Sequence, residues 1–489
     1  MKRVTLGSLA TVVGFLVFVE FTSGVLQGYY TPMLTDIARY LDIHDADVNW
    51  FEGAQLVIAA LIIPAFAKLG DMVGHKRMLL WSTALTAIAS LALPFTDSFA
   101  LFLVAWALQG FYTVWLPLEI ALIWSRSRSM PQRSAVTATA AGLLVASLEL
   151  GAIAGALTGG ALIDSLPLRT VLLIPALLVV ACFVVILVGV KESPESAGGR
   201  FDTVGMILLS LALVIFMGGL SYLRLAGAGN PLPWLLVLVG LLMLWPFARW
   251  ELRQSDPLID VRMFRSPALR PVFLTAGLFG VSVLGAQAPL STFARTDPEA
   301  NGYGLGTTGF LTSLIIGIYL IAMIVGALVF TPIARRATPR LALVGASMLV
   351  GIGFLALIPL HGTYATVVAC MVVVGLGSGA LVAALPAAAA AAAPAAQTGV
   401  ATGLTNSVKT AGGAIASATF GIALAAGAMG SAAESTAAPL AGYFTVWAIC
   451  GITALISAGL LIFVPKDSFT DQRVDAETIA QDSGRGLVG

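Results

Sequence analysis

The sequence predicts an all-α, multi-pass membrane protein of about fourteen transmembrane helices, and three observations support this class. Of the 489 residues, 58% are hydrophobic and only 10% are charged, whereas soluble domains carry about 25% charged residues. The mean hydropathy is +0.95. Apolar runs of about 20 residues, enough to cross a hydrocarbon core of roughly 30 Å, follow one another along the chain. Because these runs do not alternate with polar residues, they indicate helices rather than the strands of a membrane barrel.

Each expected span is an apolar run that ends at charged residues, glycine or proline. In chain order the spans are 8–30, 50–69, 77–95, 99–124, 135–163, 168–190, 203–222, 232–249, 269–291, 306–333, 341–360, 363–388, 397–427 and 439–464. Their even number places both termini on one side. All but five of the 26 Lys and Arg residues fall on that side, the exceptions being Arg39, Arg169, Arg224, Arg295 and Lys409. We therefore expect cytoplasmic termini and a location in the cytoplasmic (inner) membrane.

One connecting loop carries a distinctive motif. Between the second and third spans stands "AKLGDMVGHKR", which contains Gly70, Asp71, Gly74, Lys76 and Arg77. The glycines permit a tight turn, and the basic cluster keeps the loop in the cytoplasm. The plain alternative is an ordinary positively charged loop. The motif resembles the gating-loop signature of the major facilitator superfamily, with two departures, at Ala67 and Met72.

Further segments resemble one branch of that superfamily, the drug:proton antiporters with fourteen spans. They are Trp50 and Pro64, "LQG" at 108–110, the glycine-rich "GAIAGALTGG" at 151–160, and the segments 201–221, 249–270 and 399–418. The resemblance implies two six-helix bundles at 1–190 and 269–465, joined by two additional helices and a cytoplasmic connector at 191–268. The polar tail at 466–489 is expected to be disordered in the cytoplasm.

Three departures from the family pattern bear on function. Trp106 stands where the fourth-span motif has an arginine implicated in proton coupling, Ala156 replaces a fifth-span proline, and Lys409 replaces an arginine of the thirteenth span. Lys409 either lines the central cavity or extends its amine to the cytoplasmic surface. The missing arginine leaves open a carrier of the same fold that does not exchange protons.

Four glutamates fall inside predicted spans: Glu20, Glu52, Glu119 and Glu149. A charge at the centre of a bilayer costs about 2.5–3.5 kcal/mol on insertion scales, so intramembrane acids indicate function. No lysine or arginine lies in the middle of a span of the first half. Each acid is therefore expected to be protonated or to pair with a mobile cation, with Glu20 and Glu149 nearest the midplane. The structural alternatives are outer water for Glu52, Arg126 or Arg128 for Glu119, and buried hydrogen bonds for the other two.

Polar and aromatic residues near these acids are candidates for a substrate pocket. They are Gln27, Tyr30, Trp106 and Gln109 in the first half and Asn406 in the second. Apolar walls with a few polar anchors suit loosely specific ligands, although Trp and Tyr are also ordinary interface residues. Close helix packing, with rocking of the two bundles, is expected along the fifth span at Gly151, Gly155, Gly159 and Gly160.

The leading interpretation is a secondary active transporter that exports small hydrophobic or cationic compounds in exchange for protons. The alternative is a carrier without proton antiport, that is, a uniporter, an importer or a lipid transporter. An intramembrane enzyme or sensor lacks a supporting motif. We expect no cofactor beyond the proton gradient, no metal and no nucleic acid; the partners are the small-molecule substrate and the lipid bilayer, and the protein is expected to be a monomer.

Overall fold

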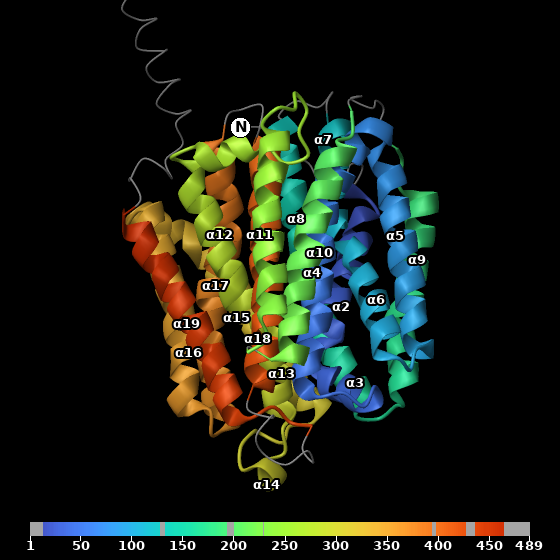
Figure 1. Cartoon of the computed structure of the whole chain (residues 1–489). Coiled ribbons are helices and arrows are strands. Elements are labelled where there is room, and N and C mark those ends of the chain that lie inside the picture. Colours follow the sequence, from blue (N-terminus) through green and yellow to red (C-terminus); the bar gives the residue numbers. More distant parts are fainter. Residues whose placement is uncertain are drawn as a thin grey trace, which may run out of the picture.

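The computed structural model describes residues 13–127, 133–192, 200–227, 229–393, 398–426 and 436–463. These segments fold into long, roughly parallel helices, and they contain no strand. The helices stand side by side, in the arrangement expected of segments that cross a membrane (Figure 1). The tail expected to be disordered, 466–489, lies outside the described residues.

The helices of the first half lie close to the expected spans. They are α2 (Leu16–Tyr29), α3 (Leu34–Tyr40), α4 (Asn49–Val73), α5 (His75–Ala92), α6 (Phe99–Gln109), α7 (Trp115–Arg126), α8 (Arg133–Ile163) and α9 (Leu168–Gly189). Short 3-10 turns interrupt this half at Thr31–Met33, Asp45–Val48, Leu93–Phe95 and Gly110–Val114. Proline in the turn after α2 and glycine at the start of the turn after α6 explain two of these interruptions.

The remaining helices follow the same pattern. They are α10 (Thr203–Ala226), α11 (Pro231–Glu251), α12 (Leu269–Val283), α13 (Gln287–Arg295), α14 (Pro298–Asn301), α15 (Gly309–Arg336), α16 (Pro339–Leu360), α17 (Tyr364–Ala392), α18 (Thr398–Ala425) and α19 (Leu440–Phe463). Short 3-10 turns lie at Val261–Arg265 and Leu284–Ala286. Among the described residues, 13 helical segments are long and apolar enough to cross a membrane. With α2, whose described part has 14 residues, they confirm the all-α class and the expected span count.

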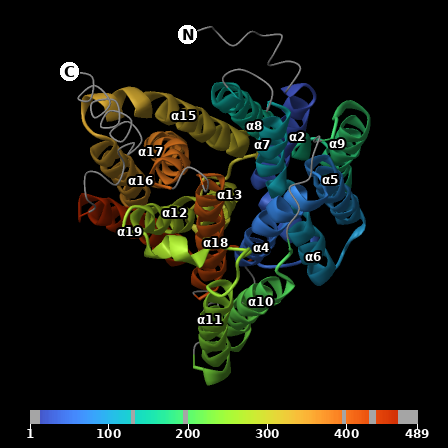
Figure 2. The ribbon, with the colours of Figure 1, turned by 90° about the horizontal axis from the view of Figure 1, so that it is seen from above.

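Buried apolar side chains gather into two main clusters. One consists almost entirely of residues from 13–190, and we call it the N-terminal cluster. The other, the C-terminal cluster, consists almost entirely of residues from 263–461. Seen from above, the helices of the two halves occupy opposite sides of the molecule (Figure 2). The boundary between the two clusters is therefore the boundary between the two halves of the chain.

The two additional helices, α10 and α11, form a hairpin at the edge of the molecule (Figure 2). α10 packs against both α4 and α18, one helix from each half. Its apolar side chains join a small cluster with Val57 on α4 and Ala414 on α18. Many large apolar side chains of α10 and α11 remain exposed, such as Val214, Leu242 and Trp245. Such a surface suits contact with lipid chains.

Candidate functional site

Two of the four candidate glutamates lie inside the N-terminal cluster. Glu20 on α2 and Glu119 on α7 are both fully buried, with 0% exposure, and their charges are close enough to interact. Their four carboxyl oxygens have no hydrogen-bond partner within the part of the chain that the structure describes. Arg126, which the sequence offered as a partner for Glu119, instead donates to the carbonyl of Lys191. In this conformation both acids are sealed from solvent.

A third acid, Glu149 on α8, has different surroundings. Glu149 and Lys409 on α18 are both partly exposed, and their charges interact across the boundary between the two halves. Among the described residues no ion pair within 4 Å joins them, so Lys409 acts on Glu149 at longer range and is not a bound partner. The sequence could not show this, because helical periodicity does not reveal which faces of two distant spans meet. Lys409 is turned toward the interior of the molecule rather than only toward its surface.

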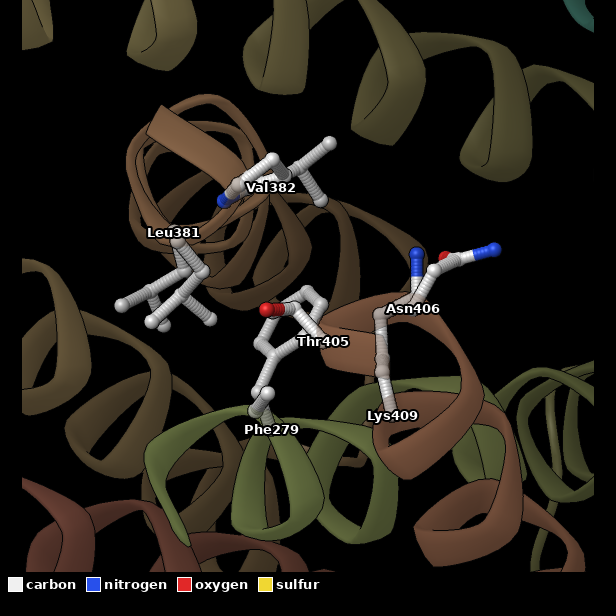
Figure 3. A pocket seen from close by; sticks show the side chains of 9 residues that line it. Phe279, Leu381, Val382, Thr405, Asn406 and Lys409 are labelled. Atoms are coloured by element: carbon white, nitrogen blue, oxygen red, sulfur yellow. The ribbon is translucent and has the colours of Figure 1, made fainter. Parts of the chain in front are cut away.

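A small apolar pocket adjoins Lys409 (Figure 3). Its cavity measures about 20 Å³ and is lined by Ala276, Phe279, Leu381, Val382, Leu385, Pro386, Thr405, Asn406 and Lys409. Figure 3 shows that the labelled side chains come from three helices, α12, α17 and α18. The predicted residue Asn406 is thus placed with Lys409, and the remaining walls are mostly hydrocarbon. In this conformation the cavity has room for about one water molecule and is too small for a drug-sized ligand.

Glu52 and Gln27, two further candidates of the first half, do not line the pocket beside Lys409. Glu52 on α4 is partly buried and lies against the backbone of Ala288 in α13. It therefore bridges the two halves instead of facing open water. Gln27 on α2 is exposed, so its amide is available to solvent or to a ligand.

Trp106 and its neighbours form an aromatic core. The Trp106 ring lies 4.9 Å from the Tyr30 ring and 5.3 Å from the Phe51 ring, measured between centroids. Gln109 donates to the Tyr30 hydroxyl at 2.9 Å and to the Ser90 hydroxyl at 2.8 Å. Tyr30, Trp106 and Gln109 were predicted to line the pocket. In this conformation all three are buried within the first half. The replacement of the motif arginine thus places an apolar ring where a fixed positive charge is usual in the resembled family.

The motif loop joins α4 to α5 and is tied to the end of α9. Gly74 adopts a positive φ of 111°, which favours glycine. The Glu192 carboxylate accepts hydrogen bonds from the backbone N–H groups of Lys76 at 2.9 Å and Arg77 at 3.1 Å. This carboxylate therefore supplies acceptors for the free backbone N–H groups at the N-terminus of α5. A Cβ at Gly74 would lie 2.7 Å from it, so the glycine is needed for the approach.

The other charged groups of the loop make local contacts. Asp71 pairs with His75 at 3.2 Å, and the Lys76 amine donates to the Leu187 carbonyl at 3.0 Å. Lys68, the second residue of the motif, pairs with Asp256 in the connector that follows α11. Hydrogen bonding from Lys68 holds the pKa of Asp256 below its usual range. The loop is therefore attached both to α9 and to the connector.

The glycine face of α8 packs mainly on α2. A Cβ at Gly151 would lie 2.1 Å from the Phe21 carbonyl oxygen, and one at Gly159 would lie 2.2 Å from that of Tyr29. Gly155 makes a similar approach to Val25. Only the fourth glycine, Gly160, meets the second half, where it lies against Gly309 and Ser313. The glycine face thus closes a helix pair within the first half, while its end reaches the boundary between the halves.

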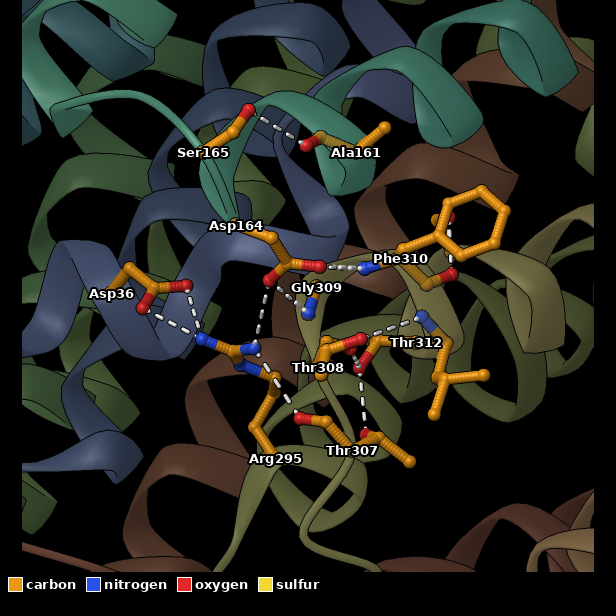
Figure 4. A network of polar contacts seen from close by, with 12 residues as sticks. Asp36, Ala161, Asp164, Ser165, Arg295, Thr307, Thr308, Gly309, Phe310 and Thr312 are labelled. Atoms are coloured by element: carbon orange, nitrogen blue, oxygen red, sulfur yellow. Dashed lines mark hydrogen bonds and ion pairs between the residues drawn. The ribbon is translucent and has the colours of Figure 1, made fainter.

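An ion-pair network joins the two halves at the end of the molecule that carries α14 (Figure 4). Arg295, at the end of α13, donates to both Asp36 oxygens at 2.7 Å and lies 3.8 Å from Asp164. Asp164, which follows α8, accepts from the backbone N–H groups of Gly309 at 2.8 Å and Phe310 at 2.9 Å. It thereby satisfies the N-terminus of α15. We call Asp36, Asp164 and Arg295 the end network.

Sequence reasoning did not single out the end network. A signal was nevertheless present, because Arg295 is one of the few basic residues on the side opposite the termini. Ser291 on α13 reinforces the contact by donating to the Thr31 carbonyl of the first half. The two halves are consequently held together at this end in the conformation described.

Comparison with proteins of known sequence gives several relatives that are named as exporters. The Mycobacterium tuberculosis (strain ATCC 25618 / H37Rv) "Drug efflux pump JefA" is 28% identical over 276 residues, covering 56% of this chain and 52% of the relative. The Streptomyces glaucescens "Tetracenomycin C resistance and export protein" is 28% identical over 248 residues, covering 50% and 45%. The chain thus spans about half the length of these curated relatives.

Comparison with solved structures supports the fold. An auto-inhibited POT family peptide transporter has a TM-score of 0.65 at 16% identity, covering 93% of this chain and 97% of the other. A mutant form of the nucleoside transporter NupG has a TM-score of 0.61 at 14% identity, covering 93% and 99%. The family model described as Major Facilitator Superfamily matches residues 16–417. The protein therefore belongs to the Major Facilitator Superfamily, and it is a multi-pass membrane protein.

Proposed function

We propose that the protein exports small hydrophobic or cationic compounds across the cytoplasmic membrane in exchange for protons. The observation that carries the proposal is that Glu149 and Lys409, oppositely charged groups from different halves, are both partly exposed, and that Lys409 lines a small apolar pocket. A site shared by both halves changes its access when the halves rock against each other. We propose that two units rock against each other, one formed by residues 1–190 and the other by residues 269–465.

The exchange follows from the charge on Glu149. As a carboxylate, Glu149 is stabilised by Lys409; as a neutral acid, it no longer attracts the lysine. A cationic or polarised substrate competes with a proton for the same carboxylate. Proton uptake therefore releases the substrate, and substrate binding displaces the proton.

The substrate class is supported by the walls of the pocket. Phe279, Leu381 and Leu385 offer apolar contact, while Asn406 and Lys409 supply polar anchors. Gln27 and Glu52 are proposed to contact ligand as the halves separate, and Tyr30, Trp106 and Gln109 to line the wall behind them. The names of the relatives, which include drug efflux and tetracenomycin C export, agree with this class.

The orientation is proposed from the distribution of basic residues. With the termini in the cytoplasm, the end network lies on the outer side, and this conformation is closed there. The motif loop, with Lys76 and Arg77, then lies on the inner side and adjusts the packing of α4, α5 and α9 during transport.

A carrier without proton exchange is the second candidate. It is favoured by Trp106, whose ring packs among Tyr30, Phe51 and Phe102 where the resembled family has an arginine. In this case the Glu149–Lys409 pair would serve binding alone. Substrate movement would then depend only on the substrate gradient.

Transport by proteoliposomes of purified protein separates the two candidates, with ethidium and tetraphenylphosphonium as probe cations. We expect a proton gradient to drive probe movement in the wild type and in the control E299Q, which changes an acid on α14 outside the site. E149Q should lose the gradient-driven component, because its amide cannot exchange a proton. Wild-type movement that is unaffected when the gradient is collapsed would favour the carrier without proton exchange.

A further inference from the structure

Two further acids meet at the end of the α10–α11 hairpin where α10 begins and α11 ends. Asp202 immediately precedes α10, and Glu251 is the last residue of α11. An added Cβ at Gly205 would lie 2.3 Å from Glu251 Oε1 and 2.6 Å from Asp202 Oδ2. The two oxygens therefore point at the same position, and the glycine leaves room for their approach. We call Asp202 and Glu251 the acid pair.

Asp202 lies in surroundings that suit a negative charge. Its Oδ1 accepts hydrogen bonds from the Gly205 backbone N–H at 2.8 Å and from the Trp250 indole N–H at 2.9 Å. Its Oδ2 lies 3.0 Å from the same indole nitrogen. Asp202 is also the N-cap of α10, where the helix dipole favours an anion. Asp202 is therefore the ionised member of the pair.

Glu251 lies in surroundings that do not suit a second negative charge. The residue is only 1% exposed. Its Oε2 accepts from the Ile259 backbone N–H at 3.3 Å, whereas no donor reaches Oε1 within the part of the chain that the structure describes. Two ionised carboxylates can only accept hydrogen bonds, so their approach is favourable only with a proton between them. The geometry therefore places a proton on Glu251, which donates it to Asp202.

The basic groups of the neighbouring elements do not replace this proton. On α4, Lys68 pairs with Asp256; on α11, Arg249 lies over the Trp245 ring, 4.3 Å from its centroid. The charged residue of α18 is Lys409, which acts on a distant acid. The charge that acts most strongly on the buried acid of the pair is that of its partner. The other charged side chains in this part of the chain are exposed or half-buried: Asp71, Arg200, Arg253, Asp260 and Arg262.

The acid pair holds the connector that leads from α11 to α12. Glu251 binds the backbone of Ile259 in this connector, and Ile259 packs against both the C-terminal cluster and the small cluster of α10. Three residues earlier, Asp256 accepts a hydrogen bond from Lys68 in the motif loop. A negative charge on Glu251 would be repelled by Asp202 and would be better solvated in water. Loss of the proton therefore drives Glu251 outward and releases Ile259.

We propose that Asp202 and Glu251 share one proton and act as a pH-sensitive latch between the hairpin and the connector. The latch is closed while the proton is bound, and it opens as the pH rises on the side that this end faces, which is the cytoplasm in the orientation proposed above. Opening frees the connector and, through Asp256 and Lys68, loosens the motif loop. The latch goes beyond the proposed function, since it needs neither substrate nor the exchange at Glu149.

Hydrogen exchange of residues 252–265 in the purified protein, measured over a series of pH values, tests the latch. In E251Q the side-chain amide can donate to Asp202 and accept from Ile259, so this variant copies the protonated acid at every pH. Wild type and E251Q have the same connector sequence, so the ratio of their exchange rates removes the intrinsic effect of pH on exchange. We expect a ratio near one at mildly acidic pH that rises several-fold at mildly alkaline pH.

A ratio that stays at one over the whole pH range would overturn the proposal. E299Q, which removes an exposed acid on α14 far along the chain, is the control and should follow the wild type at every pH. If E251Q does not fold, D202N decides the matter, because it removes the charge that repels Glu251. Its connector should exchange more slowly than that of the wild type at alkaline pH, and equal rates there would contradict the latch.

Discussion

At the residue scale, two glycines on α8 show that the effect of adding a Cβ on protein stability depends on the position. Gly151 faces the backbone of α2, where an added Cβ would lie 2.1 Å from the Phe21 carbonyl oxygen. Gly142, nine positions earlier on the same helix, is exposed and has no atom within 4 Å of an added Cβ. The same substitution therefore has opposite expected effects at these positions.

We predict that Gly151→Ala lowers the free energy of unfolding by about 1–3 kcal/mol, because α2 and α8 must separate to admit the methyl group. Gly142→Ala, the matched control, should be neutral or stabilising by up to about 1 kcal/mol, because alanine is the better helix former. Thermal unfolding of the detergent-purified variants measures both. Equal melting temperatures for the two variants would contradict the packing described.

Residue type could be predicted at the candidate site, but residue pairing could not. The four glutamates in expected spans stand out in the sequence because acids are rare in apolar runs. That Glu149 lies across the boundary from Lys409, far away in the sequence, depends on which faces of α8 and α18 are turned inward. Likewise, the sequence gives no means of separating sealed Glu20 from accessible Glu149, since both lie in the middle of apolar spans.

At the scale of the element, the spans were predictable to within a few residues. The run expected at 135–163 is α8 at Arg133–Ile163, and the run expected at 341–360 is α16 at Pro339–Leu360. Hydrophobic length sets these boundaries, and it is local information. The interruptions after α6 and α12 were not predicted, because the short turns there remain apolar.

The α10–α11 hairpin illustrates the same limit. Its two spans were predicted from length and composition, but its position was not. Because α10 contacts both α4 and α18, the hairpin lies at the boundary between the halves. The hairpin contributes no residue to the N-terminal or the C-terminal cluster. Such placement depends on long-range packing that no local pattern records.

At the scale of the whole molecule, the end network controls the relation between the halves. Arg295 binds Asp36 through two hydrogen bonds and also lies near Asp164. Its side chain is only 11% exposed, so water screens these contacts less than it screens surface ion pairs. Arg39 also approaches Asp36, at 3.8 Å, but is 61% exposed.

We predict that Arg295→Ala weakens the closure of this end by about 1–3 kcal/mol, because the half-buried Asp36 carboxylate loses both of its hydrogen bonds from Arg295. Hydrogen exchange at the start of α15 and in α13 should accelerate. Arg39→Ala is the matched control and should change the exchange rates little, since exposed ion pairs contribute about 0–1 kcal/mol. Equally fast exchange in both variants would show that the network does not hold the halves together.

The most direct test of the account is a count of protons released when the probe cation binds to purified protein in weakly buffered solution. If Glu149 exchanges a proton for a cation, adding tetraphenylphosphonium to the wild type at an acidic pH, where a proton occupies this carboxyl group, should release protons, and E149Q should bind with no release. Binding to the wild type without any change in proton count, or equal release from E149Q, would contradict the exchange at this carboxylate.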